Sequence, residues 1–250
     1  AASSPVQIRD PLTGVAGLAA TRPAGSGKPS IYLQIASGES LLLHAAPIPA
    51  NVRMAAWSYR SPAAAPIALT GPWKISFLKG GPELPPALET AALTSWTDLG
   101  GDEAKRFGGT ARYRLEFDFD SVVARAFPPV SANAPTTKPS DWLLDLGDVR
   151  ESARVILNGQ PVATAWSLPF RVRIASALLK PGRNVLELDV TNLAANRIRY
   201  MDQNKLPWKI MRDSNVVNIN YRPFDASAWP LTPSGLLGPV TLTPLKTVQP

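Results

Sequence analysis

The chain has 250 residues, of which 45% are hydrophobic and 18% are charged, and this balance indicates a folded globular protein. The absence of cysteine excludes disulfides and thiolate catalysis, and a single histidine, His44, excludes histidine-cluster metal sites. The formal charge of +7 comes from lysines and arginines that are scattered along the chain, so it favours a basic surface over a nucleic-acid partner. We therefore expect no metal, no cofactor and no nucleic acid.

No apolar run is long enough to span a membrane, and we expect no membrane partner. The first residues, "AASSPVQIRD", lack the basic and apolar regions of a signal peptide. The protein is thus expected either to be cytoplasmic or to begin here after processing or truncation.

Residues 1–66 have the pattern of the tail of a preceding β-domain followed by a linker. "SIYLQIASGESLLLHA" predicts two short apolar strands, with Ile31, Leu33 and Ile35 on one side, and "SPAAAPIA" predicts the linker. Two or three strands cannot enclose a core alone. We therefore expect this segment to pack on the second domain or on a domain outside this chain.

Residues 67–250 are predicted to form an antiparallel β-sandwich. The clearest strand is "ARYRLEFDFD", in which Tyr113, Leu115, Phe117 and Phe119 alternate with polar residues and point inward. Strands are also expected at "GPWKISFL", "DWLLDLG", "NVLELDVTN" and "GPVTLTPL", and no segment shows a sustained helical period. The predicted interior contains Trp73, Tyr113, Leu115, Phe117, Leu144, Val155, Leu188 and Leu242.

Two turns are predicted from residue type. Asn158-Gly159, after "ARVIL", favours a type I′ hairpin turn, because both residues tolerate a positive φ. Pro181-Gly182, within "LLKPGRN", favours a type II turn.

Trp166 lies in "TAWSLPFRVRI", downstream of the hairpin turn. Phe170 and the apolar residues after it alternate with Arg171 and Arg173, which is typical of a strand with one buried face. For Trp166, closure of the core beside Pro169 is favoured over stacking on sugar. Arg171 would then pair with a neighbouring loop carboxylate.

Two long connections differ in composition. The stretch 121–140 is rich in alanine and proline without a period and is expected to be a mobile surface loop. The segment 197–233 is expected to be ordered and is a candidate binding region, because it carries aromatic residues throughout: Tyr200, Trp208, Tyr221, Phe224 and Trp229.

Four long stretches together resemble a known module: "GPWKISFLKGGPELP", "SWTDLGGDEAKRFGGTARYRLEFDF", the run from "WLLDLGDVRESARVILNG" to "NVLELDVTNLAANRIR", and "FDASAWPLTPSGLLGPVTL". They resemble the galactose-binding-like, sugar-binding jelly roll of family 2-like glycoside hydrolases, and most closely the C-terminal region of family 106 α-L-rhamnosidases. The resemblance covers about residues 70 to 243. It implies an all-β jelly-roll sandwich, preceded by a short β segment of a neighbouring domain.

The resemblance also implies an absent partner. In that family the module is attached to a catalytic barrel that hydrolyses terminal α-linked rhamnose, and the catalytic carboxylates and any calcium ligands belong to the barrel. The barrel is missing from this chain, so we expect no catalytic residue here. The expected partners are this missing catalytic domain and a rhamnose-containing glycan, and the expected location is the periplasm or outside the cell, with the cytoplasm as the alternative.

The acidic residues themselves support this expectation. Glycoside hydrolysis needs two carboxyl groups that flank the scissile bond. The best local cluster, Asp141, Asp145, Asp148 and Glu151, is better explained by turns and solvated strand positions. "PSGLLG" does not match the serine nucleophile pattern, and His44 would be the sole base.

The candidate carbohydrate-binding residues lie on the long connection, where amide and guanidinium donors occur near aromatic rings. They are Asn196, Arg197, Tyr200, Trp208 and Trp229. A structural alternative is somewhat favoured, in which Asn192 and Asn196 bond to loop backbone and Arg197 pairs with an acid such as Asp202. Trp208 and Trp229 are then candidates for a stacking platform or an interdomain contact.

Three functions remain open. The favoured one is a non-catalytic part of an α-L-rhamnosidase-like hydrolase that supports the barrel, binds carbohydrate, or does both. The alternatives are a stand-alone carbohydrate-binding module and a protein-interaction scaffold.

Overall fold

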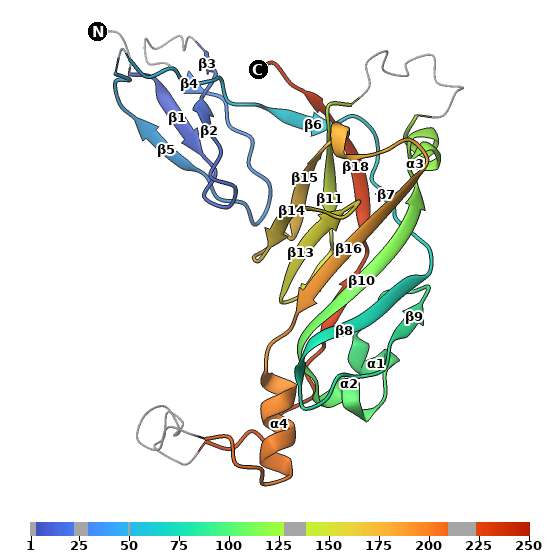
Figure 1. The fold of residues 1–250 in the computed structure, drawn as a ribbon. Coiled ribbons are helices and arrows are strands. Elements are labelled where there is room, and N and C mark those ends of the chain that lie inside the picture. The colour runs from blue at the N-terminus through green and yellow to red at the C-terminus, as the bar shows by residue number, and fades with distance from the viewer. Residues whose placement is uncertain (1–3, 23–29, 50, 128–138, 210–223) are drawn as a thin grey trace.

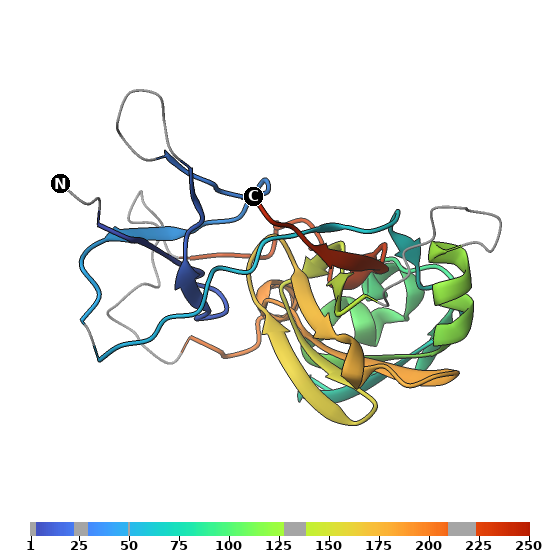
Figure 2. The same ribbon diagram turned by 90° about the horizontal axis from the view of Figure 1, so that it is seen from above.

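The computed structural model describes residues 4–22, 30–49, 51–127, 139–209 and 224–250. Two antiparallel sheets pack face to face, and a smaller N-terminal sheet lies beside them (Figure 1). Figure 2 shows the same arrangement from above, with the N-terminal strands set to one side of the sandwich. The predicted all-β sandwich is thus confirmed.

Six strands form the larger sheet, and every pairing in it is antiparallel. Their spatial order is β14 (Gln160–Ala165), β13 (Ser152–Leu157), β16 (Arg183–Thr191), β10 (Gly108–Asp118), β8 (Trp73–Gly81) and β9 (Leu88–Thr90). The long strands β10 and β16 alternate buried and more exposed residues over most of their length, because one face covers the core and the other meets solvent.

The second sheet covers the opposite side of the core. Its strands are, in spatial order, β15 (Arg171–Ala175), β11 (Asp141–Asp145), β18 (Thr241–Thr247) and β6 (Arg60–Pro62), with β7 (Ile67–Ala68) also paired to β18. A two-stranded ribbon adds β12 (Asp148–Arg150) and β17 (Gly235–Gly238). Four successive residues of β18, from Leu242 to Leu245, are buried, so both faces of this strand are covered.

The N-terminal sheet has three strands in the order β2 (Ala16–Leu18), β1 (Val6–Arg9) and β5 (Leu42–Ala45), and a short pair joins β3 (Thr21–Arg22) to β4 (Ser30–Ile31). The predicted strand at 42–45 is confirmed. The first predicted strand is wrong beyond Ile31, because β4 ends there and both Leu33 and Ile35 are exposed. Here the backbone follows the short β3–β4 pairing instead of an extended ladder.

Tyr59 joins the N-terminal sheet to the sandwich. Its hydroxyl accepts a hydrogen bond from the Ala20 backbone N–H at 2.9 Å and donates one to the Tyr32 carbonyl at 2.9 Å. Its own carbonyl accepts from Val248 N–H at 3.1 Å, just beyond β18. The strand β6 follows Tyr59 directly and is part of the second sheet. The domain boundary at residue 66 stays a prediction.

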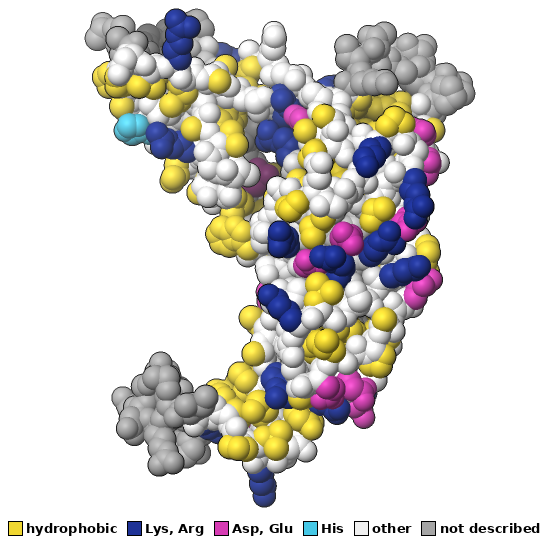
Figure 3. Space-filling model, in the orientation of Figure 1, with side chains coloured by type: hydrophobic (Ala, Val, Ile, Leu, Met, Phe, Trp, Pro, Cys, Tyr) yellow, Lys and Arg dark blue, Asp and Glu magenta, His cyan; other side chains and the backbone are white. Residues whose placement is uncertain are grey.

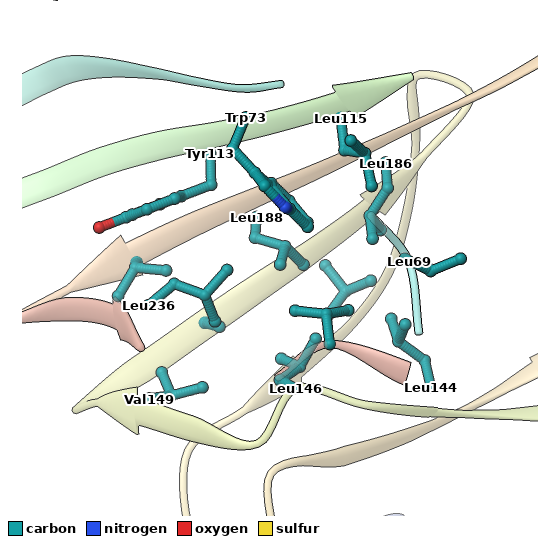
Figure 4. Packing of buried hydrophobic residues seen from close by; sticks show 14 of the residues in the cluster. Leu69, Trp73, Tyr113, Leu115, Leu144, Leu146, Val149, Leu186, Leu188 and Leu236 are labelled. Atoms are coloured by element: carbon teal, nitrogen blue, oxygen red, sulfur yellow. The ribbon is translucent and has the colours of Figure 1, made fainter. Parts of the chain in front are cut away.

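The core lies between the two large sheets. Figure 4 shows how side chains from the facing sheets interdigitate around Trp73, Tyr113 and Leu188. All eight residues predicted for the interior are buried: Trp73, Tyr113, Leu115, Phe117, Leu144, Val155, Leu188 and Leu242. Period-2 patterning therefore located the core correctly.

Four short α-helices occur in the described residues, namely α1 (Trp96–Leu99), α2 (Asp102–Arg106), α3 (Phe119–Ala126) and α4 (Ala195–Gln203), together with a 3₁₀ turn at Ser176–Leu178. None of these helices is long and apolar enough to cross a membrane.

Helix α3 corrects two expectations. The strand predicted through Phe119 ends at Asp118, and part of the predicted loop 121–140 is helical, whereas residues 128–138 lie outside the described part. The Asp118 carboxylate caps the helix by accepting from Ser121 N–H at 2.7 Å. Phe119 still reaches the core, because its ring packs edge-on against Trp142 with centroids 5.2 Å apart.

Both predicted turns have the required backbone. Asn158 and Gly159 have φ values of 53° and 79°, and they connect the paired residues Leu157 and Gln160. Gly182 has a φ of 68°, as a type II turn needs after Pro181.

Candidate functional site

The connection that follows β16 carries all the predicted carbohydrate-binding residues. It leaves the end of the larger sheet, forms α4, and returns to the sandwich at β17 (Figure 1). Tyr221 of this connection lies outside the described residues.

Asn192 and Asn196 attach this connection to the sandwich. The Asn192 side chain accepts from Gly109 N–H at 2.9 Å and donates to the Phe107 carbonyl at 3.1 Å. Asn196, only 2% exposed, donates to the Thr232 carbonyl at 2.7 Å and accepts from Thr232 N–H at 2.8 Å. The structural alternative is thus confirmed for both amides, and sugar contact at Asn196 would require these bonds to break.

In the described part of the chain, the cation beside the Tyr200 ring is Arg106 and not Arg197. The guanidinium of Arg106, from α2, lies 5.1 Å from the centre of the Tyr200 ring and also bonds to Glu83. Among the described residues the ion-pair partner of Asp202 is Lys209, at 3.4 Å. The expected Arg197–Asp202 pair is therefore wrong.

Trp208 and Trp229 are brought together through Phe224, which the candidate set did not include. The ring centroids of Trp208 and Phe224 are 5.8 Å apart, and those of Phe224 and Trp229 are 5.4 Å apart, both with edge-on geometry. We call these three residues the aromatic arm. Trp229 is 39% exposed, so the aromatic arm is accessible to a partner.

A cleft of ≈ 560 Å³ adjoins the aromatic arm, lined in part by Leu206, Trp208 and Asp225. The ammonium of Lys209 lies over the rings of Trp208 and Phe224, at 5.4 and 5.7 Å from their centres. This cation lies on one face of Trp208 and of Phe224, so at these two rings the described geometry favours a packed contact over an open sugar platform.

Asp202, in α4, holds the aromatic arm in place. Its carboxylate accepts from the Trp208 indole N–H at 2.6 Å and from Ala226 N–H at 2.7 Å. Burial alone would raise the pKa of Asp202, but the hydrogen bonds from Ala226 and Trp208 and the charge of Lys209 lower this pKa below its ordinary value.

The Asp202→Asn substitution is expected to loosen the aromatic arm. It removes the charge that strengthens both hydrogen bonds, so exchange of the Trp208 indole proton should accelerate by about tenfold or more. Because the folded-state pKa is depressed, the anchoring is complete above the unfolded value of about 4 and is lost as the pH falls through the folded pKa. NMR hydrogen exchange of the indole signal measures both effects.

Asp225→Asn is the matched control, because within the described residues the Asp225 carboxylate bonds only locally, to Ser227 N–H at 2.8 Å. It should leave the Trp208 indole signal unchanged. Equal acceleration in both variants would show that Asp202 is not the anchor.

Three of the four residues of the acidic cluster form ion pairs with arginine. Asp141 pairs with Arg60 at 2.9 Å, Asp145 with Arg171 at 2.7 Å, and Asp148 with Arg150 at 2.7 Å. A loop carboxylate was expected to pair with Arg171. The observed partner, Asp145, is instead the last residue of strand β11. Within the described ranges, no group of three or more histidine, cysteine, aspartate or glutamate residues could hold a metal ion.

Trp166 departs from the expectation. It was predicted to close the core, but the residue is 60% exposed. The chain crosses from β14 in one sheet to β15 in the other at this point, and Phe170 and Val172 fill the interior instead. The crossing turns the indole outward.

The described residues form an all-β sandwich in which Asp141, Asp145 and Asp148 are held in ion pairs. Its exposed tryptophans, Trp166 and Trp229, lie on connections, where binding is usually located. A protein from Formosa agariphila named "Putative beta-glucuronidase" is 32% identical over 204 residues, which cover 72% of this chain. A solved structure of a rhamnosidase from Novosphingobium sp. PP1Y matches 97% of this chain with 25% identity and a TM-score of 0.64. No family model matches the chain.

The chain is therefore a β-sandwich related to glycoside hydrolases. It spans only 16% of the Formosa protein and 20% of the rhamnosidase, so it corresponds to a small part of each.

Proposed function

We propose that this chain is a non-catalytic part of a glycoside hydrolase of the α-L-rhamnosidase type, with a galactose-binding-like jelly roll at residues 67–250 and the end of a preceding β-domain at 1–66. The observation that carries this proposal is the match to the rhamnosidase, which extends over 97% of the chain and so includes the N-terminal sheet as well as the sandwich. The resemblance to family 106 supports a C-terminal position and an export of the parent protein from the cytoplasm.

The state of the carboxylates supports a non-catalytic role. Hydrolysis requires an acid and a base or nucleophile about 5–10 Å apart, both open to the sugar. In the acidic cluster, Asp141, Asp145 and Asp148 each have an arginine partner, and Asp145 also accepts from Gly147 N–H at 2.9 Å. A carboxylate that is already bonded to an arginine in this way is not open to a sugar.

The exposed apolar side chains support a role in holding a catalytic barrel. In the N-terminal sheet, Leu42 and Leu43 are exposed on β5, and Leu33 and Ile35 are exposed nearby. Figure 3 shows hydrophobic side chains over this sheet and again around the α4 region at the opposite end of the molecule. Such exposed patches mark contact surfaces. We propose that the barrel covers them and that the aromatic arm is part of the same contact.

The alternative parent enzyme is a β-glucuronidase, and the 32% identity to the Formosa protein favours it. A stand-alone carbohydrate-binding module and a scaffold domain remain as alternatives of other classes. Both of these predict a chain that works without a barrel.

The chain alone is expected to hydrolyse neither an aryl α-L-rhamnoside nor an aryl β-D-glucuronide. A purified parent protein that includes the barrel should hydrolyse one of them, and the substrate that is cleaved identifies the parent enzyme. Turnover by the 250-residue chain that is abolished by Asp145→Asn or Asp148→Asn would refute the non-catalytic role. If the gene of the parent protein encodes no glycosidase domain in addition to this chain, the proposed attachment to a catalytic barrel is refuted.

A further inference from the structure

A second cleft, of ≈ 510 Å³, lies between the N-terminal sheet and the sandwich, and its lining includes Trp166. Figure 3 shows the molecule hollowed between these two parts. This cleft is separate from the aromatic arm, which lies beyond the other end of the larger sheet (Figure 1).

The loop that carries Trp166 is held firmly. Its C-terminal end is fixed by hydrogen bonds from Arg171 N–H to the Pro169 carbonyl at 2.8 Å and from Leu146 N–H to the Phe170 carbonyl at 2.9 Å. On the other wall, a Cβ at Gly38 would lie 3.4 Å from Pro169 Cδ, so the loop next to Glu39 packs against this one. The indole is therefore exposed on a loop whose backbone is fixed at its C-terminal end, which lowers the entropic cost of ordering this loop on binding.

The lining of this cleft contains a hydrogen-bond donor and a hydrogen-bond acceptor in addition to the indole. Arg173 lines it and has no ion-pair partner among the described residues, so its guanidinium can donate hydrogen bonds. Glu39 lines the opposite wall and uses one carboxylate oxygen to accept from Ala36 N–H at 2.9 Å, which leaves the other oxygen as an acceptor. An aromatic face with a donor and an acceptor nearby matches a pyranose ring, which has an apolar C–H patch and hydroxyl groups.

The formal charges of the lining cancel. Asp10 and Glu39 come from the N-terminal part, and Arg171 and Arg173 come from β15. An anionic sugar would gain no net attraction in this surrounding, because the two arginines and two carboxylates of the lining sum to zero and Arg171 is already paired with Asp145.

We infer that this cleft binds a neutral pyranoside of a glycan, with the sugar ring stacked on Trp166 and its hydroxyls bonded to Arg173 and Glu39. The inference rests on the proposed function, a non-catalytic part of a glycoside hydrolase, and names a sugar-binding site within it. It moves the sugar contact away from the five residues expected on the long connection.

The test is an NMR titration of the 250-residue chain with methyl α-L-rhamnopyranoside, followed on the indole N–H signals of its seven tryptophans. The signal that disappears in Trp166→Ala identifies the Trp166 indole. It should shift on titration, with a dissociation constant on the order of 1 mM.

Three variants and a second sugar make the result decisive. Trp166→Ala should weaken binding by at least about tenfold, and Arg173→Gln by about fivefold. Trp229→Ala removes the exposed tryptophan of the aromatic arm and should leave binding unchanged. Methyl β-D-glucuronide should bind no more tightly than the neutral sugar.

Several results would overturn the site: no shift of the Trp166 signal up to high sugar concentration, unchanged binding in Trp166→Ala, or loss of binding in Trp229→Ala alone. Tighter binding of the glucuronide would overturn the neutral ligand class. The hydrolysis assay on the parent protein is independent of these outcomes, so a failure of this site is distinguishable from a failure of the proposed parent enzyme.

Discussion

Replacing Trp73 with alanine is expected to lower the free energy of unfolding by about 3–5 kcal/mol. Trp73 begins β8, is only 1% exposed, and packs between the two large sheets beside Tyr113 and Leu188 (Figure 4). Removal of the indole loses its transfer free energy and leaves a cavity that two hydrogen-bonded sheets cannot close. Urea unfolding followed by circular dichroism measures the change.

Trp166→Ala is the matched control, since it deletes the same side chain from an exposed position. It should change the free energy of unfolding by less than about 0.5 kcal/mol. Comparable losses in the two variants would contradict the burial of Trp73, the exposure of Trp166, or both.

Gly235→Ala is expected to destabilise the sandwich by about 3 kcal/mol or more. Gly235, at the start of β17, has a φ of +102°, which L side chains rarely adopt. A Cβ there would also lie 2.2 Å from the Tyr113 hydroxyl and 2.8 Å from the Trp96 ring. Both aromatic side chains are buried, so neither can move without disturbing the core.

Gly159→Ala separates the two causes. Gly159 has a φ of +79° in the hairpin turn, but a Cβ there would meet nothing within 4 Å. It should therefore cost about 1 kcal/mol, from backbone strain alone. If thermal unfolding shows equal losses for Gly159→Ala and Gly235→Ala, steric exclusion at Gly235 is not the cause.

The core was predictable from the sequence because each long strand covers it with one face. The alternation in β10 and β16 appears in the sequence as a period of two, and burial follows the same period. The same rule was wrong at Phe119, where the apolar alternation continues but the Asp118 carboxylate caps a helix. Local capping competes with strand extension at such a position, and alternation alone does not reveal the outcome.

The surfaces were less predictable, because they depend on contacts between distant segments. Helix α4 contains mostly polar residues and lacks a clear apolar period, and it is held by the bonds from Asn196 to Thr232. Trp166 lies shortly before Pro169 and Phe170 in the sequence, and this pattern was interpreted as that of a core residue. Its exposure results from the crossing between sheets, which no local pattern encodes.

The position of β18 sets the order in which the sandwich can form. This strand follows all the others of the second sheet in the chain, yet it lies inside that sheet, between β11 and β6, with Lys246 opposite Ser61. A ribosome-bound chain that has not yet extruded residues 241–247 would hold β11 and β6 without the strand that joins them. Pairing across so long a separation closes a large loop, which slows folding and exposes strand edges to other chains meanwhile. Molecular chaperones that shield such edges would then matter most in the interval before the final strand emerges.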